Sequence, residues 1–324
     1  MTAASRTLVQ TLAQLTPEQV ELRDDFIRCC RDTRQTMPAR WLYDHRGSEL
    51  FEEITTLTEY YPTRTELALL RDADAKLHEA IGEGRMLIEF GAGSAHKTPA
   101  LIEAIRPARY VPIDVSGDYL RESSAELAQA FPDLEIEPIE ADFNRTVPLP
   151  HCPRRLPIIG FFAGSTIGNL TPFEATDLLR RMGETLGDDA LLLIGMDRVK
   201  SLDILLPAYD DARGVTAAFN LNLLHRINRE LDCNIPVEAF AHEARWSQPR
   251  TRIEMHLVAL RDVEFSLGEE RISFGKGATI HTENSHKYRF EEARMLLRCG
   301  GWEPIDAWSD PADHFTLFLA RRDS

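Results

Sequence analysis

Gly91 and Gly93 stand directly after the apolar run 87–90 and directly before a pattern typical of a helix. The run contains the acid Glu89, and the whole stretch predicts a strand, a tight turn and a helix. Glycine adopts positive φ without strain, and because it has no Cβ a ligand can lie against its backbone. The N-terminus of the next helix would also present N–H groups to that ligand. We therefore expect a ligand-binding turn here.

The residues after this turn indicate which ligand it binds. A dinucleotide site would need a small residue at the position of His96. Asp114 ends a second short strand, 109–114, about 20 residues after the glycines, where a carboxylate can accept hydrogen bonds from ribose hydroxyls and repels a ribose phosphate. Asp142 and Phe143 end a third strand, 134–143, and suit an adenine amine and ring. The set resembles the class I S-adenosylmethionine-dependent methyltransferases.

Each of these features has an ordinary structural alternative. A glycine pair after an apolar run is often a plain turn, and Asp114 or Asp142 alone could cap the N-terminus of a helix. Three strand-end acids in βαβ order are harder to obtain by chance. Their combination favours an adenosine-type site.

Length and composition fit a globular protein. The 324 residues allow one large domain or two of ordinary size, and a hydrophobic content of 43% is enough for a packed core. No apolar run reaches the roughly 20 residues that span a bilayer, and residues 1–14 lack the basic start and apolar stretch of a signal peptide. We expect a soluble cytoplasmic protein without a membrane segment.

Cysteine spacing and net charge restrict the classes of ligand. The chain has no C-x-x-C pair, so we expect free thiols and neither disulfides nor a cysteine zinc site. The five cysteines are Cys29, Cys30, Cys152, Cys233 and Cys299. A formal charge of −15 argues against nucleic acid as a substrate, because binding of that kind needs lysine and arginine against phosphate. The negative net charge favours a small or cationic methyl acceptor.

Helices and strands alternate from Glu66 to about residue 200. Helical patterns begin at Thr98, Gly117 and Pro172, and apolar strands end at Asp114, Asp142, Phe162 and Asp197. The fourth strand, 156–162, is apolar throughout, as expected for a parallel strand buried on both faces. Right-handed crossovers then predict an α/β fold with a doubly wound sheet and a ligand at the carboxyl ends of its strands.

The segments outside this alternation predict a second lobe. A surface helix is expected over 17–34, and the segment 38–66 is rich in aromatic and charged residues that could form a site or pack a cap onto the core. After Lys200, a helical pattern over 207–229 is followed by a strand over 252–260. Further strands are expected at 263–265 and 272–274, and the sheet pattern resumes with a helix over 291–299, a glycine C-cap at 300–301 and a strand over 315–319. We expect a class I methyltransferase domain over 64–200 with 290–324 and a substrate-binding lobe over 15–63 with 201–289.

Several longer motifs carry a more specific resemblance. They are W-L-Y-D at 41–44, E-Y-Y-P-T-R at 59–64, G-S-T-I-G-N-L at 164–170, A-Y-D-D at 208–211, G-V-T-A-A-F-N at 214–220, I-E-M at 253–255 and T-E-N-S-H-K-Y at 282–288. Together they are similar to the histidine Nα-methyltransferases of ergothioneine biosynthesis, and the likeness covers nearly the whole chain. This resemblance implies transfer of three methyl groups from S-adenosylmethionine to the α-amino group of L-histidine, which gives hercynine.

The resemblance also assigns residues to the two ligands. The cofactor would meet Gly91, Lys97, Asp114, Asp142 and Phe143. Histidine would meet Tyr43, Tyr60, Gly164, Asn169, Tyr209, Met255, Glu283 and Ser285, of which Tyr43, Gly164 and Asn169 would lie at the reacting amine. No metal is expected, and a monomer is favoured.

The residue types suit these roles. Glu283 and Ser285 lie two apart on an expected strand, so both could face an imidazole, which offers one N–H donor and one acceptor. A buried carboxylate would also favour a protonated ring, whereas the alternative for Glu283 is a surface strand residue. Asn169 and Tyr209 can donate to the substrate carboxylate without carrying a positive charge, which leaves the amine free to attack.

The chemistry would be an in-line displacement at a sulfonium methyl group. Alignment supplies much of the rate in such reactions, with effective molarities of roughly 10⁵ M or more. The amine must be neutral, and the nearby sulfonium disfavours its ammonium form. Tyr43 is the candidate for holding the amine, directly or through a water, and no strong general base is required.

Other readings stay open at this point. His96, His256 and His286 are expected to be surface or packing residues rather than bases or ligands. The acceptor could be another small amine, and the chain could also be a non-catalytic S-adenosylmethionine-binding protein.

Overall fold

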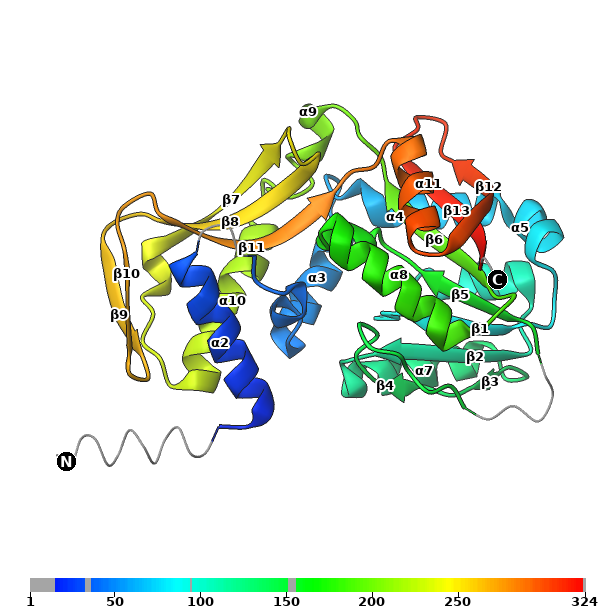
Figure 1. The fold of residues 1–324 in the computed structure, drawn as a ribbon, viewed down its shortest axis with the longest axis horizontal. Helices are drawn as coiled ribbons and strands as arrows, with labels where there is room; N and C mark the ends of the chain where they lie inside the picture. Colours follow the sequence, from blue (N-terminus) through cyan, green and yellow to red (C-terminus); the bar gives the residue numbers. More distant parts are fainter. Residues whose placement is uncertain (1–14, 33–35, 94, 151–155, 323–324) are drawn as a thin grey trace. The chain divides into compact units, whose positions relative to one another are not determined.

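The computed structural model describes residues 15–32, 36–93, 95–150 and 156–322 (Figure 1). The expectations for residues 1–14 and for Cys152 lie outside these ranges. The chain forms two compact units, of which the first is Met1–Tyr60 with Leu202–Asn284 and the second is Tyr61–Ser201 with Ser285–Ser324. The boundaries expected from the sequence, 63/64, 200/201 and 289/290, lie close to these.

The second unit is built on an eight-stranded sheet with the order β12-β13-β6-β5-β1-β2-β3, in which β4 also pairs with β2. Its strands are β1 (Met86–Phe90), β2 (Arg109–Asp114), β3 (Glu135–Ile136), β4 (Ile139–Glu140), β5 (Ile158–Phe162), β6 (Leu191–Asp197), β12 (Trp302–Ser309) and β13 (Phe315–Arg322). Strands β1 to β6 run parallel, whereas β13 and β12 are antiparallel. Because β1 lies between β2 and β5, the strand order reverses at β1, where open α/β sheets bind ligands.

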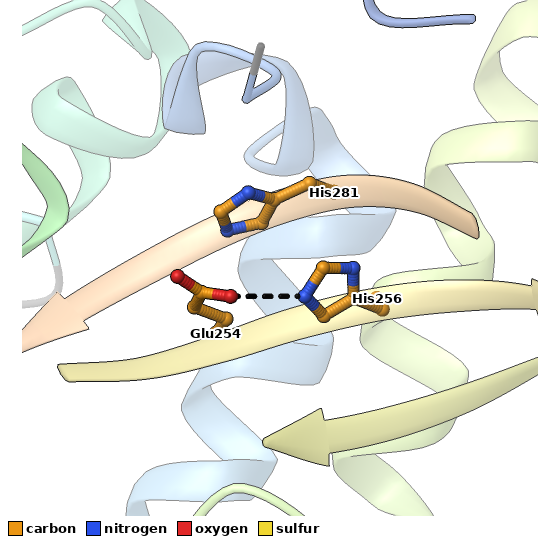
Figure 2. Close-up of side chains that lie close together, drawn as sticks. All are labelled: Glu254, His256 and His281. Carbon is orange, nitrogen blue, oxygen red and sulfur yellow. Dashed lines mark hydrogen bonds and ion pairs between the residues drawn. The ribbon is translucent and has the colours of Figure 1, made fainter. Parts of the chain in front are cut away.

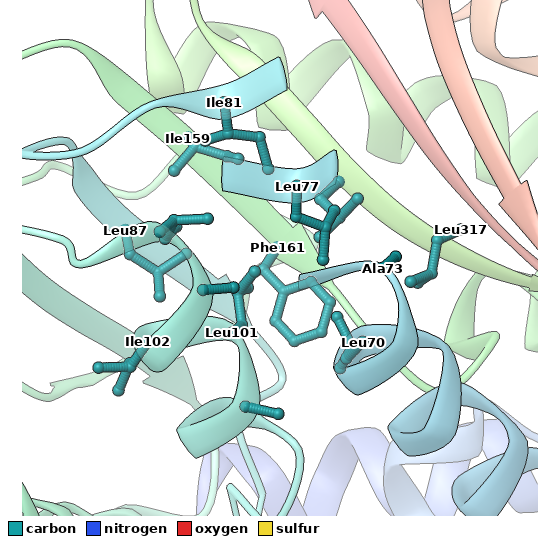
Figure 3. Close-up of a cluster of buried hydrophobic side chains, with 14 of the residues drawn as sticks. Leu70, Ala73, Leu77, Ile81, Leu87, Leu101, Ile102, Ile159, Phe161 and Leu317 are labelled. Atoms are coloured by element: carbon teal, nitrogen blue, oxygen red, sulfur yellow. The ribbon is translucent and has the colours of Figure 1, made fainter. Parts of the chain in front are cut away.

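Helices of the second unit bury the apolar side chains of both sheet faces. They are α4 (Tyr61–Asp72), α5 (Asp74–Ile81), α6 (Thr98–Ile105), α7 (Gly117–Ala130), η2 (Thr166–Asn169), α8 (Pro172–Leu186) and α11 (Phe290–Cys299). Leu70, Leu77 and Leu101 pack with Phe161 in one core cluster, as Figure 3 shows, and α8 and α11 contribute to a second cluster. The two clusters confirm the doubly wound sheet that was predicted.

Two parts of this sheet differ from the expectation. The third strand was expected to be continuous over 134–143, but it is divided into β3 and β4 around Pro138. Proline has no N–H to give to the ladder, so an edge strand is interrupted there. Strand β12 was not predicted, although it pairs along β13 and begins with the buried Trp302.

The first unit combines helices with a three-stranded sheet, order β11-β8-β7, and a hairpin of β9 and β10. Its elements are α2 (Pro17–Arg31), η1 (Ala39–Leu42), α3 (His45–Thr55), α9 (Leu202–Leu205), α10 (Val215–Leu231), η3 (Val237–Ala239), β7 (Phe240–Ser247), β8 (Arg252–Ala259), β9 (Val263–Leu267), β10 (Glu270–Phe274) and β11 (Thr279–His286). The last two residues of β11 belong to the second unit. Strands β8, β9 and β10 confirm the strands expected at 252–260, 263–265 and 272–274, and β7 was missed.

Helix α10 begins later than expected. The pattern predicted a helix from 207, but Asp211 accepts hydrogen bonds from the N–H groups of Val215 (3.0 Å) and Thr216 (2.7 Å), and Gly214 has φ +73°. This side chain therefore satisfies the first N–H groups of a helix that starts at Val215. Helix α2 ends at Arg31 and buries Leu22 and Phe26. Across the described ranges, no helix has both the length and the apolar character that a bilayer span requires.

Candidate active site

The turn after β1 has the geometry expected of a ligand-binding turn. Gly91 has φ +70°, and its N–H donates to the carbonyl of Ile113 at 2.8 Å. A Cβ added at Gly91 would lie 3.3 Å from the ring of Phe143. Glycine is therefore needed both for the backbone conformation and for the close approach of this aromatic ring. Two residues assigned to the cofactor are thus brought together.

The two strand-end acids are held by local hydrogen bonds. Asp114 accepts from the N–H of Gly93 at 3.1 Å and from that of Ser116 at 2.9 Å, so its carboxylate is fixed beside the glycine turn. Asp142 accepts from the N–H of Asn144 at 2.9 Å. Asp114 is not the N-cap of α7, because that position is Ser116. The helix-capping alternative for Asp114 is therefore wrong.

Glu66 joins the turn after β1 to the loop after β5. Its side chain is fully buried, and its Oε2 accepts hydrogen bonds from Lys97 Nζ at 2.5 Å and from the N–H of Gly164 at 2.8 Å. One carboxylate therefore positions a residue assigned to the cofactor and a residue assigned to histidine. No site role was predicted for Glu66, although its place at the end of the aromatic, charged segment 38–66 was a usable signal.

Glu89 has a structural role in β1. Its Oε2 accepts hydrogen bonds from Tyr110 (2.6 Å) and Thr98 (2.8 Å), and all three side chains are buried. Burial raises the pKa of Glu89 to about 7. The acid of the apolar run thus ties β1 to β2 and to the start of α6 rather than facing a ligand.

The loop after β5 lies against the end of β11. Gly164 has φ +77°, and a Cβ at Gly168 would lie 2.9 Å from the carbonyl oxygen of His286. Tyr288 also donates its hydroxyl to the carbonyl of Ile167 at 3.3 Å. The helix η2, which contains the half-buried Asn169, is therefore fixed beside the segment that follows Ser285.

In the first unit, the three assigned tyrosines belong to one aromatic chain. Tyr43 contacts Phe51 and Phe219, with ring centroids 5.3 and 5.4 Å apart. Phe51 contacts Tyr60 at 6.1 Å, and Tyr60 contacts Tyr209 at 6.1 Å. Aromatic packing of this kind restricts ring motion. Phe219 lies in the motif at 214–220, but neither Phe219 nor Phe51 was predicted as a site residue.

Met255 and Glu283 are buried on β8 and β11, which pair in the same sheet. Thr282 donates its hydroxyl to the carbonyl of Met255 at 2.9 Å. Glu283 retains only 6% of its exposure, so the alternative of a surface strand residue is wrong.

Glu254, His256 and His281 form a cluster of side chains of the types that bind metals, as Figure 2 shows. The Nε2 of His256 lies 3.4 Å from Oε2 of Glu254, but the two imidazoles are stacked, with centroids 4.6 Å apart and planes 20° apart. A ring nitrogen binds a metal in the plane of its ring, and one ion cannot lie in two parallel planes. The other oxygen of Glu254 also accepts from Arg252 at 2.7 Å. We interpret the cluster as packing.

The remaining predicted histidines have different surroundings. His96 is exposed, whereas His286 is buried at the end of β11. Within the described residues, the cysteines Cys29, Cys30, Cys233 and Cys299 are free, as expected. Burial raises the pKa of the Cys29 thiol to about 12, so this cysteine is unreactive.

The sheet, its glycine turn and the acids at its strand ends define a class I S-adenosylmethionine-dependent methyltransferase. Residues 22–322 match a family model described as histidine-specific methyltransferase, SAM-dependent. The chain belongs to this family.

Curated relatives support the assignment. The chain is 41% identical to "Histidine N-alpha-methyltransferase" of Mycolicibacterium smegmatis, over 89% of this chain and 91% of that one. It is 38% identical to the protein of the same name from Mycobacterium tuberculosis, over 93% and 95%. It is also 27% identical to "Ergothioneine biosynthesis protein 1" of Neurospora crassa, over 90% of this chain and 34% of that one.

Proposed function

We propose that this enzyme transfers three methyl groups from S-adenosylmethionine to the α-amino nitrogen of L-histidine and so makes hercynine, the first step of ergothioneine biosynthesis. The observation that carries the proposal is Glu283, a buried carboxylate two residues before Ser285 on β11, inside a motif of the histidine-specific family. The names of the mycobacterial and fungal relatives support the same substrate and pathway.

The second unit has the groups that S-adenosylmethionine needs. We assign Asp114 to the ribose hydroxyls, Asp142 and Phe143 to adenine, and Gly91 and Lys97 to the remainder of the molecule. The positive φ of Gly91 and the ring of Phe143 packed against it fit a ligand that lies along this turn. When bound, S-adenosylmethionine supplies an activated methyl group on a sulfonium.

We assign the histidine residues by chemical type. Asn169 and Tyr209 would donate to the substrate carboxylate, and Tyr43 would hold the amine. Glu283 and Ser285 would bind the imidazole. Tyr60, Gly164 and Met255 complete the set as neighbours that shape the space around the substrate.

These residues would contribute to catalysis mainly by aligning the amine of the substrate with the methyl group. The aromatic contacts of Tyr43 with Phe51 and Phe219 fix the side chain that would hold the amine. Glu66 fixes Gly164 through its N–H. Three transfers also require that few fixed donors point at the growing amine. A tyrosine hydroxyl can accept from the N–H of the primary and of the secondary amine, whereas the tertiary amine of the third transfer has no N–H.

Glu283 favours histidine over another small amine, because a simple amine has no ring N–H that could donate a hydrogen bond to a buried carboxylate. The family assignment likewise favours an enzyme over a non-catalytic binding protein. A monomeric state and a cytoplasmic location stay predictions from the sequence.

A reciprocal pair of variants tests the site. Glu283→Ala should weaken histidine binding by about 10- to 100-fold, because it removes a charged hydrogen-bond partner, and leave S-adenosylmethionine affinity unchanged. Asp114→Ala should weaken S-adenosylmethionine and leave histidine affinity almost unchanged. Calorimetric titration of each ligand measures both effects. Unchanged histidine affinity in Glu283→Ala would remove the imidazole assignment.

A further inference from the structure

His242 on β7 forms two hydrogen bonds within the first unit. Its Nε2 lies 2.8 Å from the carbonyl oxygen of Tyr209, and its Nδ1 lies 2.9 Å from Nδ2 of Asn220. Asn220 is the last residue of the motif at 214–220 and is fully buried on α10. Tyr209 is one of the residues assigned to the substrate carboxylate. The ring of His242 therefore links a motif residue that has no assigned role to a residue of the candidate site.

We propose that His242 is a positioning residue, which holds the backbone of Tyr209 in place for the histidine substrate and does so in the one tautomer that Asn220 selects. This role rests on the proposed function, in which Tyr209 donates to the substrate carboxylate. The bond from His242 is made to the backbone carbonyl of Tyr209, and the hydroxyl of that residue takes no part in it.

The tautomer of His242 follows from which groups can donate. The carbonyl of His256 can only accept, and it lies 3.2 Å from Asn220 Nδ2, so the amide must direct its NH2 group toward this carbonyl. The same NH2 group faces His242 Nδ1, which must then accept with its lone pair. A neutral imidazole with a lone pair on Nδ1 has its proton on Nε2. His242 Nε2 is therefore the donor to the carbonyl of Tyr209.

Asn220 is fixed in this orientation. Its NH2 group has two hydrogens and two acceptors, whereas its Oδ1 has no partner among the described residues. A flipped amide would place Oδ1 against the carbonyl oxygen of His256, and two acceptors repel each other. Because Asn220 is fully buried, the flip would also leave a buried NH2 group without these acceptors, which is costly.

The ionisation of His242 agrees with a neutral ring. Burial lowers the pKa of His242, whereas the backbone bond to Tyr209 and the acids Asp210, Asp211 and Glu243 act to raise it. The net direction is downward, so the ring is neutral at neutral pH. A protonated ring would direct an Nδ1–H at an amide NH2 group that can only donate.

Tyr209 depends on such contacts because it lies between α9 and α10, outside any helix or strand. Its N–H donates to the carbonyl of Leu206 at 3.0 Å, and the bond from His242 ties its carbonyl to β7. Its ring packs against Tyr60 with the centroids 6.1 Å apart. The directions open to a side chain depend on the φ and ψ of its backbone. Loss of the bond from His242 would therefore let the Tyr209 ring move from its position.

His242→Phe keeps a ring of similar size and removes both hydrogen bonds. A displaced Tyr209 should weaken ground-state and transition-state binding of the substrate carboxylate equally, which raises KM for histidine at an unchanged kcat. We expect KM to rise about 2- to 10-fold, the range of one net hydrogen bond, and kcat to stay within about twofold. A merely structural defect would lower the active fraction, and so kcat, at an unchanged KM. An unchanged KM would overturn the proposal.

A double-mutant cycle measures whether His242 acts through Tyr209. Tyr209→Phe removes the hydroxyl that would bind the carboxylate, so in that background His242→Phe should not raise KM further. Additive increases would mean that His242 acts elsewhere, which contradicts the proposed role. His225→Phe is the control, because His225 is exposed on α10 of the same unit and should leave KM and kcat unchanged.

His242→Gln covers the case in which His242→Phe does not fold. The amide NH2 group of glutamine can still donate to the carbonyl of Tyr209, so KM should stay within about twofold of the wild-type value. A rise in KM as large as that of Tyr209→Phe would count against the proposal.

Magnetic resonance of the labelled ring nitrogens tests the tautomer without any substrate. We expect the Nε2–H form of His242 at neutral pH, with its signals identified by their loss in His242→Gln. An Nδ1–H form or a protonated ring would overturn the proposal. Failure of the proposed function has a different signature, because the wild-type enzyme would then methylate no histidine while the tautomer stayed the same, and the role of His242 in substrate binding would be wrong as well.

Discussion

Two buried polar clusters, one from each unit, differ in how they tolerate burial. The cluster of Asp197, Lys200, Lys287 and Tyr61 in the second unit, which we call the aspartate cluster, keeps its charges and pairs each of them. The cluster of Glu254, His256 and His281 in the first unit, which we call the histidine cluster, contains two stacked rings. There the Nδ1 of His256 is buried and has no hydrogen-bond partner among the described residues.

The pKa values follow this difference. Burial acts to raise the pKa of Asp197, but Lys287 and Lys200 outweigh it and lower the pKa. In the histidine cluster, burial and the neighbouring His256 lower the pKa of His281 to about 4. The carboxylate and the two lysines of the aspartate cluster are therefore charged in the folded protein, whereas the two imidazoles of the histidine cluster are neutral. A charged cluster needs every partner and so fixes the groups around it, whereas a neutral cluster tolerates an unpaired atom and responds to acid.

The largest effect is expected in the aspartate cluster. Asp197→Asn leaves Lys200 and Lys287 buried without a counter-charge, and breaking a buried pair in this way costs about 3–5 kcal/mol. Urea unfolding of the wild type and the variant measures the loss. Asp118→Asn is the control, because its pair with Arg121 is on the surface and should contribute less than about 1 kcal/mol. Equal losses in the two variants would contradict the comparison.

An intermediate effect is expected when the histidine cluster is acidified. The pKa of His281 is about 4 in the folded chain and about 6.5 when unfolded, so the unfolded chain binds a proton first. The contribution of neutral His281 to the free energy of unfolding is fully present above pH 6.5. It is lost as the pH falls from 6.5 to 4, and the loss is about 3 kcal/mol at most. Unfolding by urea between pH 7.5 and 4.5 measures the slope.

His281→Phe isolates this contribution, because phenylalanine keeps an aromatic ring stacked against His256 but cannot bind a proton. The variant should be less stable than the wild type at pH 7.5, since it loses the bond to Thr36 Oγ1, and should lose less stability on acidification. A slope as steep as that of the wild type would show that another group is responsible.

The smallest effect is expected at His256. His256→Phe keeps the stacked arrangement, removes the unpaired Nδ1 and gives up only a 3.4 Å contact with Glu254. We expect a change of less than about 1 kcal/mol in the free energy of unfolding, because the lost bond is long and the unpaired atom is removed. A loss as large as that of Asp197→Asn would mean that the histidine cluster is also held by its hydrogen bonds.

The sequence predicted the parts of the fold that depend on local pattern. The parallel strands, the glycine turn and the acids at 114 and 142 follow from short apolar runs and the residues that end them. The start of α10 was misplaced because the capping bonds of Asp211 outweigh the apolar pattern from 207. Strand β12 was missed because its partner β13 decides its conformation, rather than any strong pattern of its own.

Site residues could be proposed from the sequence where one motif contains them, but not where distant residues combine. Glu283 and Ser285 could be assigned from the motif at 282–288, which also contains Lys287. Lys287 and Asp197 lie far apart in the chain, and only the fold brings them into an ion pair. The same holds for Glu66 and Gly164.

The most direct test of the account is mass spectrometry of the purified protein incubated with S-adenosylmethionine and an equimolar mixture of the twenty amino acids. We predict that histidine alone gains three methyl groups. Methylation of a different amino acid would leave the fold and the cofactor assignment in place but contradict the roles of Glu283 and Ser285. The absence of any methylated product would contradict the enzymatic function itself.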